Sequence, residues 1–322
     1  MHSDSNALWA GIDVAKEWVD IAVVEQGRIV EQWRCARSTV ELQQAAERLQ
    51  RRKVVGAVLE SSGGLEIAVG TALLAGGVMA FRINAKRVRD FARAHGVLAK
   101  TDRVDARVLA LFGERMQPPA RDWLDQDRQQ LADWITRQRQ LIDMRTMERN
   151  RLHCTTASPL RRSIERMLRW LEKELERIES ELQAWWREHG ARWNEQETRL
   201  RSMPGVGPKT ARVLIAHLPE LGRANRREIA SLAGLAPIAC ESGAWRGRRR
   251  IRGGRAVVRS ALYLASWTAV RLDATFRAFY ENLVARGKAR QLALIAVARR
   301  MLVALNDMLK NSRNWEKCTI SA

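Results

Sequence analysis

The chain has 322 residues, which is enough for two or three domains with cores of their own. It carries 56 Lys and Arg against 36 Asp and Glu, a net charge of +20, so polyanions such as nucleic acids are its expected partners. No apolar run is long enough to span a bilayer and no secretory signal precedes Leu8, so we expect a cytoplasmic protein with no membrane contact. The four cysteines are far apart and form no CxxC pair, so we expect reduced thiols instead of a zinc knuckle or a disulfide framework.

The first part of the chain predicts a mixed α/β domain. Short apolar or alternating runs predict strands at 8–14, 18–24, 28–35, 54–59 and 78–83. Amphipathic segments predict helices over 38–51, which Ser38 would cap, and over 65–74, which Gly76 would end. Three antiparallel strands followed by helix, strand, helix and strand are typical of a ribonuclease-H-like fold, and we place this domain at 1–122.

The rest of the chain predicts helices. Segments 124–154 and 159–189 have apolar residues three and four positions apart, the pattern of a helical hairpin or coiled coil, and we assign 123–195 to it. A domain packed on itself and an oligomerising coiled coil both remain open. The final region, 196–322, predicts a mostly helical domain with a basic, loop-rich insert at 237–254.

Four carboxylates predict a metal site. Asp13 and Glu60 end the first and fourth strands, and Asp102 and Asp105 lie three apart on a helix that Thr101 would cap. Four oxygen donors of this kind suit two Mg²⁺ or Mn²⁺ ions acting on a phosphodiester. Each residue alone is more often a cap or a solvated charge, so the hypothesis depends on the combination and its order.

A glycine-rich turn at 203–211 is the second candidate site. Gly205 and Gly207 permit a tight turn before a helix, where backbone N–H groups can hold a phosphate with help from Lys209 and Arg212. The segment resembles the helix-hairpin-helix motif of nonspecific DNA-binding proteins. The alternative is an ordinary corner between two helices.

The insert is the third candidate site. Its glycines allow close approach to a duplex, its arginines can neutralise phosphates, and Trp245 can stack on a base, although a solvated loop is the default for such a run. The predicted nucleic-acid contacts in and after the insert are Trp245, Arg246, Arg248, Arg249, Arg250, Arg252, Arg255 and Arg259. Ser242 is the hydroxyl within it, but no His is near it in sequence, so chemistry alone gives weak support for a nucleophile.

The motifs together resemble the DEDD transposases of insertion-sequence family one hundred and ten. The resemblance lies in Gly11-Ile-Asp13-Val-Ala-Lys16, Glu60, Lys100-Thr-Asp102-x-x-Asp105-Ala, Pro204-Gly-Val-Gly-Pro208, Gly234-Leu-Ala-Pro237, Glu241-Ser-Gly243 and Arg252-Gly-Gly-Arg255-x-x-x-Arg259. They occur in the family's order over nearly the whole chain. One departure is the density of arginine from 246 to 255, which leaves the contacts of that loop open.

The resemblance implies a domain like the Holliday-junction resolvase RuvC, a coiled-coil insertion and a C-terminal transposase domain. It implies that Asp13, Glu60, Asp102 and Asp105 bind Mg²⁺ or Mn²⁺ and that Ser242 forms a covalent phosphoserine link. The implied partners are a guide RNA called a bridge RNA and the target and donor double-stranded DNA. The implied oligomer is a homotetramer, a dimer of dimers. The implied location is the bacterial cytoplasm, at the nucleoid when the protein is active. A hydrolytic Holliday-junction-type nuclease and a non-catalytic basic scaffold are the alternatives.

Overall fold

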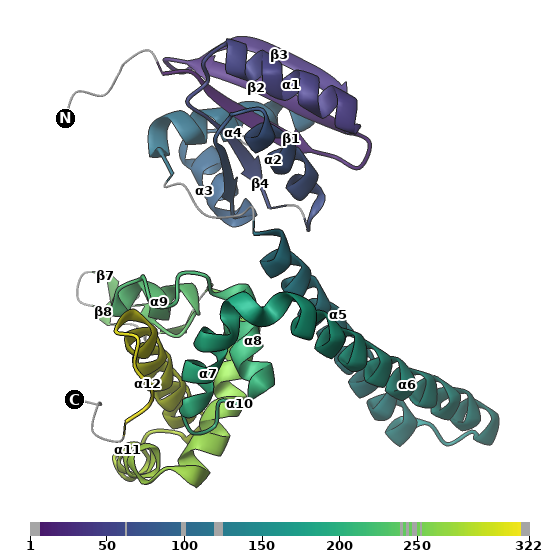
Figure 1. Ribbon diagram of the computed structural model, residues 1–322, viewed down its shortest axis with the longest axis vertical. Helices are drawn as coiled ribbons and strands as arrows, with labels where there is room; N and C mark the ends of the chain where they lie inside the picture. Colours follow the sequence, from purple (N-terminus) through teal and green to yellow (C-terminus); the bar gives the residue numbers. More distant parts are fainter. Residues whose placement is uncertain are drawn as a thin grey trace. The chain divides into compact units, whose positions relative to one another are not determined.

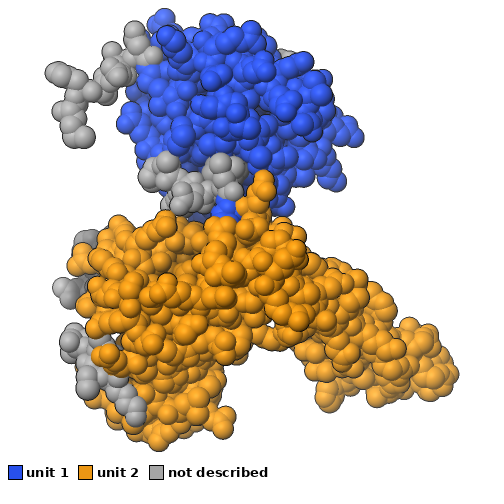
Figure 2. Space-filling model, viewed as in Figure 1, with its two compact units in different colours: residues 1–125 blue, residues 126–322 orange. Residues whose placement is uncertain are grey.

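The computed structural model describes residues 7–61, 63–97, 101–118, 125–238, 241–242, 245–246, 250–251 and 253–316. For residues 102, 103, 241, 242, 245, 246 and 250 the backbone alone is described. The chain divides into two compact units, residues 1–125 and 126–322, coloured blue and orange in Figure 2. No helix in the described ranges has the length and apolar character that crossing a membrane requires.

A five-stranded mixed sheet forms the centre of the first unit. Its strands lie in the order β3-β2-β1-β4-β5, with β1, β2 and β3 antiparallel and β1, β4 and β5 parallel. The strand bounds are β1 Trp9–Val14, β2 Trp18–Glu25, β3 Arg28–Ala36, β4 Gly56–Glu60 and β5 Ala80–Ile83. The turn between β2 and β3 has Gln26 and Gly27 at positive φ, which fits the twist of a hairpin. The predicted mixed sheet is confirmed.

Helices cover both faces of this sheet (Figure 1). They are α1 Thr39–Arg51, α2 Leu65–Ala75, α3 Ala85–Ala94 and α4 Asp102–Met116. Apolar residues of α1 and α2 pack on one face and those of α3 and α4 on the other, because side chains alternate along each strand. Ser38 caps α1 as predicted, whereas α3, which Asn84 caps, is not among the elements that the sequence patterns predict.

The second unit begins with a long helical hairpin, α5 Gln126–Cys154 and α6 Ser158–His189 (Figure 1). Leu141, Leu171 and Ile178 are buried between the two helices. The two helices agree with the segments predicted from the apolar spacing. At the base of the hairpin, Leu131 and Trp186 join the core of the domain that follows.

That domain is a bundle of helices around one apolar core. Its elements are the 3-10 helix η1 Gly190–Trp193 and the helices α7 Asn194–Ser202, α8 Pro208–His217, α9 Arg226–Leu232, α10 Ala256–Leu272, α11 Ala274–Ala285 and α12 Arg290–Lys310. The basic insert between α9 and α10 is more regular than predicted. It contains two short antiparallel ladders, β6 Pro237–Ile238 with β9 Arg250–Ile251 and β7 Glu241–Ser242 with β8 Trp245–Arg246.

Candidate active site

The carboxyl ends of two neighbouring parallel strands carry Asp13 and Glu60. The paired register of β1 with β4 ends one residue before each of them, so they come next to one another along the sheet edge. Trp9 and Val58 belong to the core that α3 and α4 cover. Asp13 is four residues after Trp9 and Glu60 is two after Val58, so both carboxylates lie on that same face. Each is partly exposed and makes contacts within the protein.

Helix α4 lies directly on β1 and brings its first turn to the same edge. A Cβ at Gly11 would lie 2.1 Å from the carbonyl oxygen of Ala106, so this approach requires glycine. Further along, a Cβ at Gly113 would lie 2.4 Å from the Trp9 ring, so α4 runs back along β1 in the opposite direction. The start of α4 is therefore beside the end of β1.

The start of α4 contains the other two predicted ligands. The Thr101 hydroxyl accepts a hydrogen bond from the Val104 amide at 3.4 Å, which confirms the predicted cap. Asp105 immediately precedes Ala106, the residue that faces Gly11, and the Asp102 backbone lies one turn closer to the helix start. The structure thus places the backbone of all four predicted residues at one edge of one sheet.

This edge has the donor chemistry of a site for a hard divalent cation. Carboxylate oxygens are the ligands that Mg²⁺ and Mn²⁺ prefer, and the residues present fit such an ion. Among the described side chains, which exclude that of Asp102, no three His, Cys, Asp or Glu residues are grouped closely enough to hold one ion. Assignment of the four residues as metal ligands is therefore a proposal.

A fifth carboxylate, Asp20, lies in the same row and is not among the residues that the sequence motifs predict. It pairs directly across from Asp13 in the antiparallel register, so the two side chains share one face of the sheet. Asp20 is 1% exposed. The Arg34 guanidinium on the next strand donates to both of its oxygens, with the closest contact 2.7 Å. The signal in the sequence is one acid inside the otherwise apolar run of β2.

Ser242 lies on a β-hairpin in the second unit. Its backbone pairs with that of Trp245 in the β7–β8 ladder, and the β6–β9 ladder lies below it at the hairpin base. Of the other residues predicted to bind nucleic acid here, Arg246 and Arg250 are described by backbone only. Arg248, Arg249 and Arg252 lie outside the described residues.

The base of this hairpin is closed by two arginines that the sequence predicted to bind nucleic acid. A Cβ at Gly254 would lie 2.2 Å from the Gly234 nitrogen, so the two ends of the hairpin touch. The Arg259 guanidinium donates to the carbonyl oxygens of both Gly253 and Gly234, at 3.0 and 3.4 Å. These hydrogen bonds connect the two ends of the hairpin through the Arg259 side chain.

Arg255 holds the same base against the preceding turn. It forms a bidentate ion pair with Glu220, at 2.5 and 2.7 Å, and its amide donates to the Leu232 carbonyl. Burial, and then the charge of Arg255, lowers the pKa of His217 to about 4. His217 is therefore neutral near pH 7.

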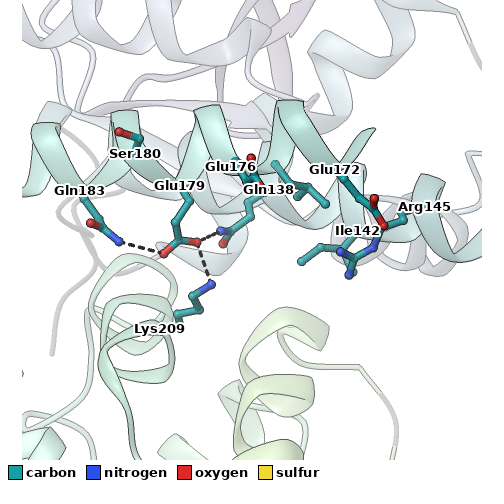
Figure 3. Close-up of a pocket in the computed structure, with 10 residues that line it drawn as sticks. Gln138, Ile142, Arg145, Glu172, Glu176, Glu179, Ser180, Gln183 and Lys209 are labelled. Carbon is teal, nitrogen blue, oxygen red and sulfur yellow. Dashed lines mark hydrogen bonds and ion pairs between the residues drawn. The ribbon is translucent and has the colours of Figure 1, made fainter. Parts of the chain in front are cut away.

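The glycine-rich turn places Lys209 at the start of α8, beside the helical hairpin (Figure 3). Its ammonium lies 2.7 Å from a Glu179 oxygen, and Gln138 and Gln183 donate to the same carboxylate. Burial opposes ionisation of Glu179, but the hydrogen bond and charge of Lys209 and the hydrogen bonds from Gln183 and Gln138 together lower the pKa of that carboxyl. Lys209 is still 72% exposed, so a phosphate could reach it in exchange for Glu179.

Arg212 is directed into the protein. Its side chain is 16% exposed, lies 3.4 Å from Glu197 and stacks on the Trp186 ring, whose Nε1 donates to the same glutamate. These contacts join α6, α7 and α8. This arrangement does not support the predicted nucleic-acid contact at Arg212, because its guanidinium contacts buried side chains of the protein.

Comparisons with known proteins point to one family in both units. A DEDD transposase model of IS110 proteins matches residues 10–156, and the model described as "Transposase IS116/IS110/IS902 family" matches residues 197–281. The chain is therefore similar to IS110-family transposases over these two ranges. Together they contain every carboxylate of the candidate site and Ser242.

Individual relatives are similar over parts of the chain. An uncharacterised 43.6 kDa protein of insertion element IS110 from Streptomyces coelicolor is 34% identical over 36% of this chain and 29% of its own length. An uncharacterised 42 kDa protein of IS900 from Mycobacterium paratuberculosis is 32% identical over 38% and 31%. The chain thus matches about a third of the length of these two relatives. The pilin gene-inverting protein of Moraxella bovis is 23% identical over 73% of this chain and 74% of its own.

Among solved structures, Thermus thermophilus RuvC in complex with a Holliday junction substrate is similar to part of the chain. The identity is 18% and the TM-score 0.28, over 34% of this chain and 96% of that one.

Proposed function

We propose that this chain is a metal-dependent DNA transposase of the recombinase type. The observation that carries the proposal is the sheet edge at which Asp13, Glu60 and the first turn of α4 meet, because it gathers carboxylates in a protein of net charge +20. The Moraxella relative, named as a gene-inverting protein, favours DNA rearrangement over simple degradation.

In the proposed reaction, Asp13, Glu60, Asp102 and Asp105 hold the cation and Ser242 is the nucleophile. A divalent cation held by these residues would neutralise charge on the scissile phosphate. The Ser242 oxygen forms a bond to phosphorus while the bond from phosphorus to a sugar oxygen breaks, and the freed strand leaves with a hydroxyl. Attack by a strand hydroxyl on the phosphoserine reverses these steps, so strands rejoin without ATP.

The proposed partners follow from the charge and from the family resemblance. A bridge RNA would pair with target and donor DNA, and the working particle would be a tetramer of two dimers acting in the bacterial cytoplasm at the nucleoid. The excess of Lys and Arg supports binding to both kinds of nucleic acid, since each phosphate contact releases counterions. It does not favour one nucleic acid over the other.

The first test is strand cleavage by carboxylate variants. The protein, purified with the RNA that it binds in its host, is given Mg²⁺ and a supercoiled plasmid that contains the host's insertion junctions. Asp13→Asn, Glu60→Gln, Asp102→Asn and Asp105→Asn should each reduce cleavage by at least about a hundredfold. Substituting residues that only hydrogen-bond to metal ligands already lowers metal affinity or activity by about 10–100-fold, and these four residues are the proposed ligands themselves. RNA binding should stay near the wild-type level. Wild-type cleavage rates in any two variants would contradict the assignment.

The same reaction separates the proposal from its two alternatives. A protein–DNA adduct that survives denaturation, and that Ser242→Ala abolishes, is expected for a serine nucleophile. Mg²⁺-dependent nicking without an adduct would instead indicate the hydrolytic Holliday-junction-type nuclease. Binding without nicking would indicate a basic scaffold.

A further inference from the structure

One helix next to the carboxylate edge has an exposed basic face that no predicted site includes. Lys86, Arg89 and Arg93 are spaced three and four residues apart on α3, so they lie on one side of the helix. Val88 and Ala92 on the opposite side are buried in the core beneath α3. The basic face therefore points away from the sheet.

These three side chains are available to a ligand. Lys86 and Arg93 are exposed and Arg89 is partly exposed. Among the described residues none of the three forms a salt bridge, in contrast to Arg82 just before the helix, whose guanidinium lies 3.6 Å from Glu66. Asp90 is the acid within α3, so the face keeps a positive balance.

The position of α3 links this face to the candidate active site. Its preceding strand β5 ends at Ile83, which pairs with Glu60 in the parallel register, and the Ser61 amide donates to the Ile83 carbonyl. The helix then starts at Ala85, so its positive N-terminal end and Lys86 lie at the sheet edge that carries Glu60. The face continues from there to Arg93, about 10 Å along the helix axis.

We propose that the basic face of α3, Lys86, Arg89 and Arg93, binds the backbone of the DNA strand that is cleaved at the carboxylate edge. The proposal rests on the proposed function, because it takes the bound polymer to be the substrate. Each strand of duplex DNA advances about 3.4 Å along the helix axis per nucleotide, so a span of about 10 Å along that axis corresponds to about three nucleotides. Three cations over that length match three phosphates.

The chemistry of the face indicates recognition of phosphates instead of bases. It presents two guanidinium groups and an ammonium but no exposed aromatic ring, and the nearby Phe91 packs against Phe112. Such contacts position a strand without reading its sequence. The expected partner at this face is DNA, because the phosphodiester that reaches Glu60 is the one to be cut in the proposed reaction.

The experiment compares two triple variants of the full-length protein. Lys86→Gln, Arg89→Gln and Arg93→Gln remove the face, and Arg51→Gln, Arg52→Gln and Lys53→Gln remove three exposed charges just before β4, at the opposite edge of the sheet from Glu60. Binding to labelled duplex DNA, single-stranded DNA and RNA of arbitrary sequence is measured without Mg²⁺ over a series of salt concentrations.

The α3 triple variant should bind both DNA probes more weakly. For the loss of three phosphate contacts, its slope of log affinity against log salt should fall by about 3 with duplex DNA and by about 2 with single-stranded DNA. The control triple variant should keep the wild-type slope with every probe. In the plasmid assay the α3 variant should need more DNA for half-maximal cleavage. An unchanged DNA slope, or an equal fall for the control, overturns the proposal, as does a fall confined to RNA.

Failure of the proposed function has a different signature. If the wild-type protein binds DNA through α3 but never cleaves it with Mg²⁺, the reaction is wrong and the binding face is retained. If the wild-type protein cleaves and the α3 variant binds and cleaves equally well, the face is wrong and the reaction is retained.

Discussion

At the scale of single residues, the pair of Asp20 and Arg34 is the part of the candidate site with the clearest consequence. The carboxylate is almost fully buried directly opposite Asp13, and the guanidinium neutralises it, so the pair adds no net charge beside the proposed cation. Loss of the carboxylate would leave a positive charge there. That charge would repel a divalent ion at the site, because the partly buried surroundings screen the repulsion less than bulk water does.

Asp20→Asn should therefore have two effects. Stability should fall by about 2 kcal/mol, because a buried ionic hydrogen-bond partner is removed, and more Mg²⁺ should be needed for half-maximal cleavage. Urea unfolding and a Mg²⁺ titration of plasmid cleavage measure these effects. Glu47→Gln is the matched control, since it removes the acid of an exposed pair with Arg51, 3.9 Å apart, and should change stability by less than about 0.5 kcal/mol. An unchanged Mg²⁺ requirement in Asp20→Asn would mean that the Asp20–Arg34 pair only stabilises the fold.

Residue identity alone does not separate arginines that face solvent from those that brace the fold. Asp13, Glu60 and Asp105 can be found because the ends of strands and helices can be located from apolar periodicity and caps. Arg212 follows the glycine-rich turn, and Arg255 and Arg259 follow the basic insert. Their partners Glu197, Glu220 and the Gly234 carbonyl are distant in sequence. Periodicity contains no information about such pairs.

At the scale of elements, the hairpin that carries Ser242 depends on its closed base. Arg259 donates to carbonyls at both ends, whereas the ladders above it contain two residues per strand. Ladders of this length are marginal by themselves. We therefore expect the contacts at the hairpin base, those of Arg259 and the Arg255 pair with Glu220, to stabilise the hairpin more than its ladders do.

Arg259→Gln should loosen the hairpin while the helical bundle stays folded. We expect thermolysin to cut within 235–254 several-fold faster, and cleavage of plasmid DNA to fall, with little change in helical circular dichroism. Arg277→Gln is the matched control, because Arg277 also donates to two backbone carbonyls, those of Val270 and Arg271, at another corner. Equal thermolysin rates in the two variants would mean that the ladders alone hold the hairpin.

The elements themselves are largely predictable from the sequence. The strands of the first unit and the two long helices agree with their apolar patterns within two residues. Among the strands, the largest differences are at the starts of β4, at Gly56 instead of 54, and of β5, at Ala80 instead of 78. Helix α3 escapes prediction because it is short and basic, with Val88 and Ala92 as its buried residues. The ladders of the insert escape it because each strand has two residues, too few for an alternating pattern, and Pro237 and Glu241 are residue types with low strand propensity.

At the scale of the whole molecule, the proposed nucleophile and the proposed metal ligands belong to different compact units. Asp13, Glu60, Asp102 and Asp105 lie in residues 1–125 and Ser242 lies in 126–322. A complete site therefore needs one unit of each kind. They can come from one chain or, as the family resemblance implies for an oligomer, from two.

Mixing inactive variants distinguishes these cases. Asp13→Asn protein retains an intact Ser242, and Ser242→Ala protein retains intact carboxylates, so a mixed oligomer contains some complete sites if the two units come from different chains. Partial strand cleavage and a phosphoserine adduct should then return, although full recombination requires several cuts and need not. The matched control mixes Asp13→Asn with Glu60→Gln. Both variants have a defective set of carboxylates in the first unit, so no mixed oligomer contains a complete site and the mixture should stay inactive. If differently tagged chains co-purify and the first mixture still gives no adduct, each site is completed within a single chain.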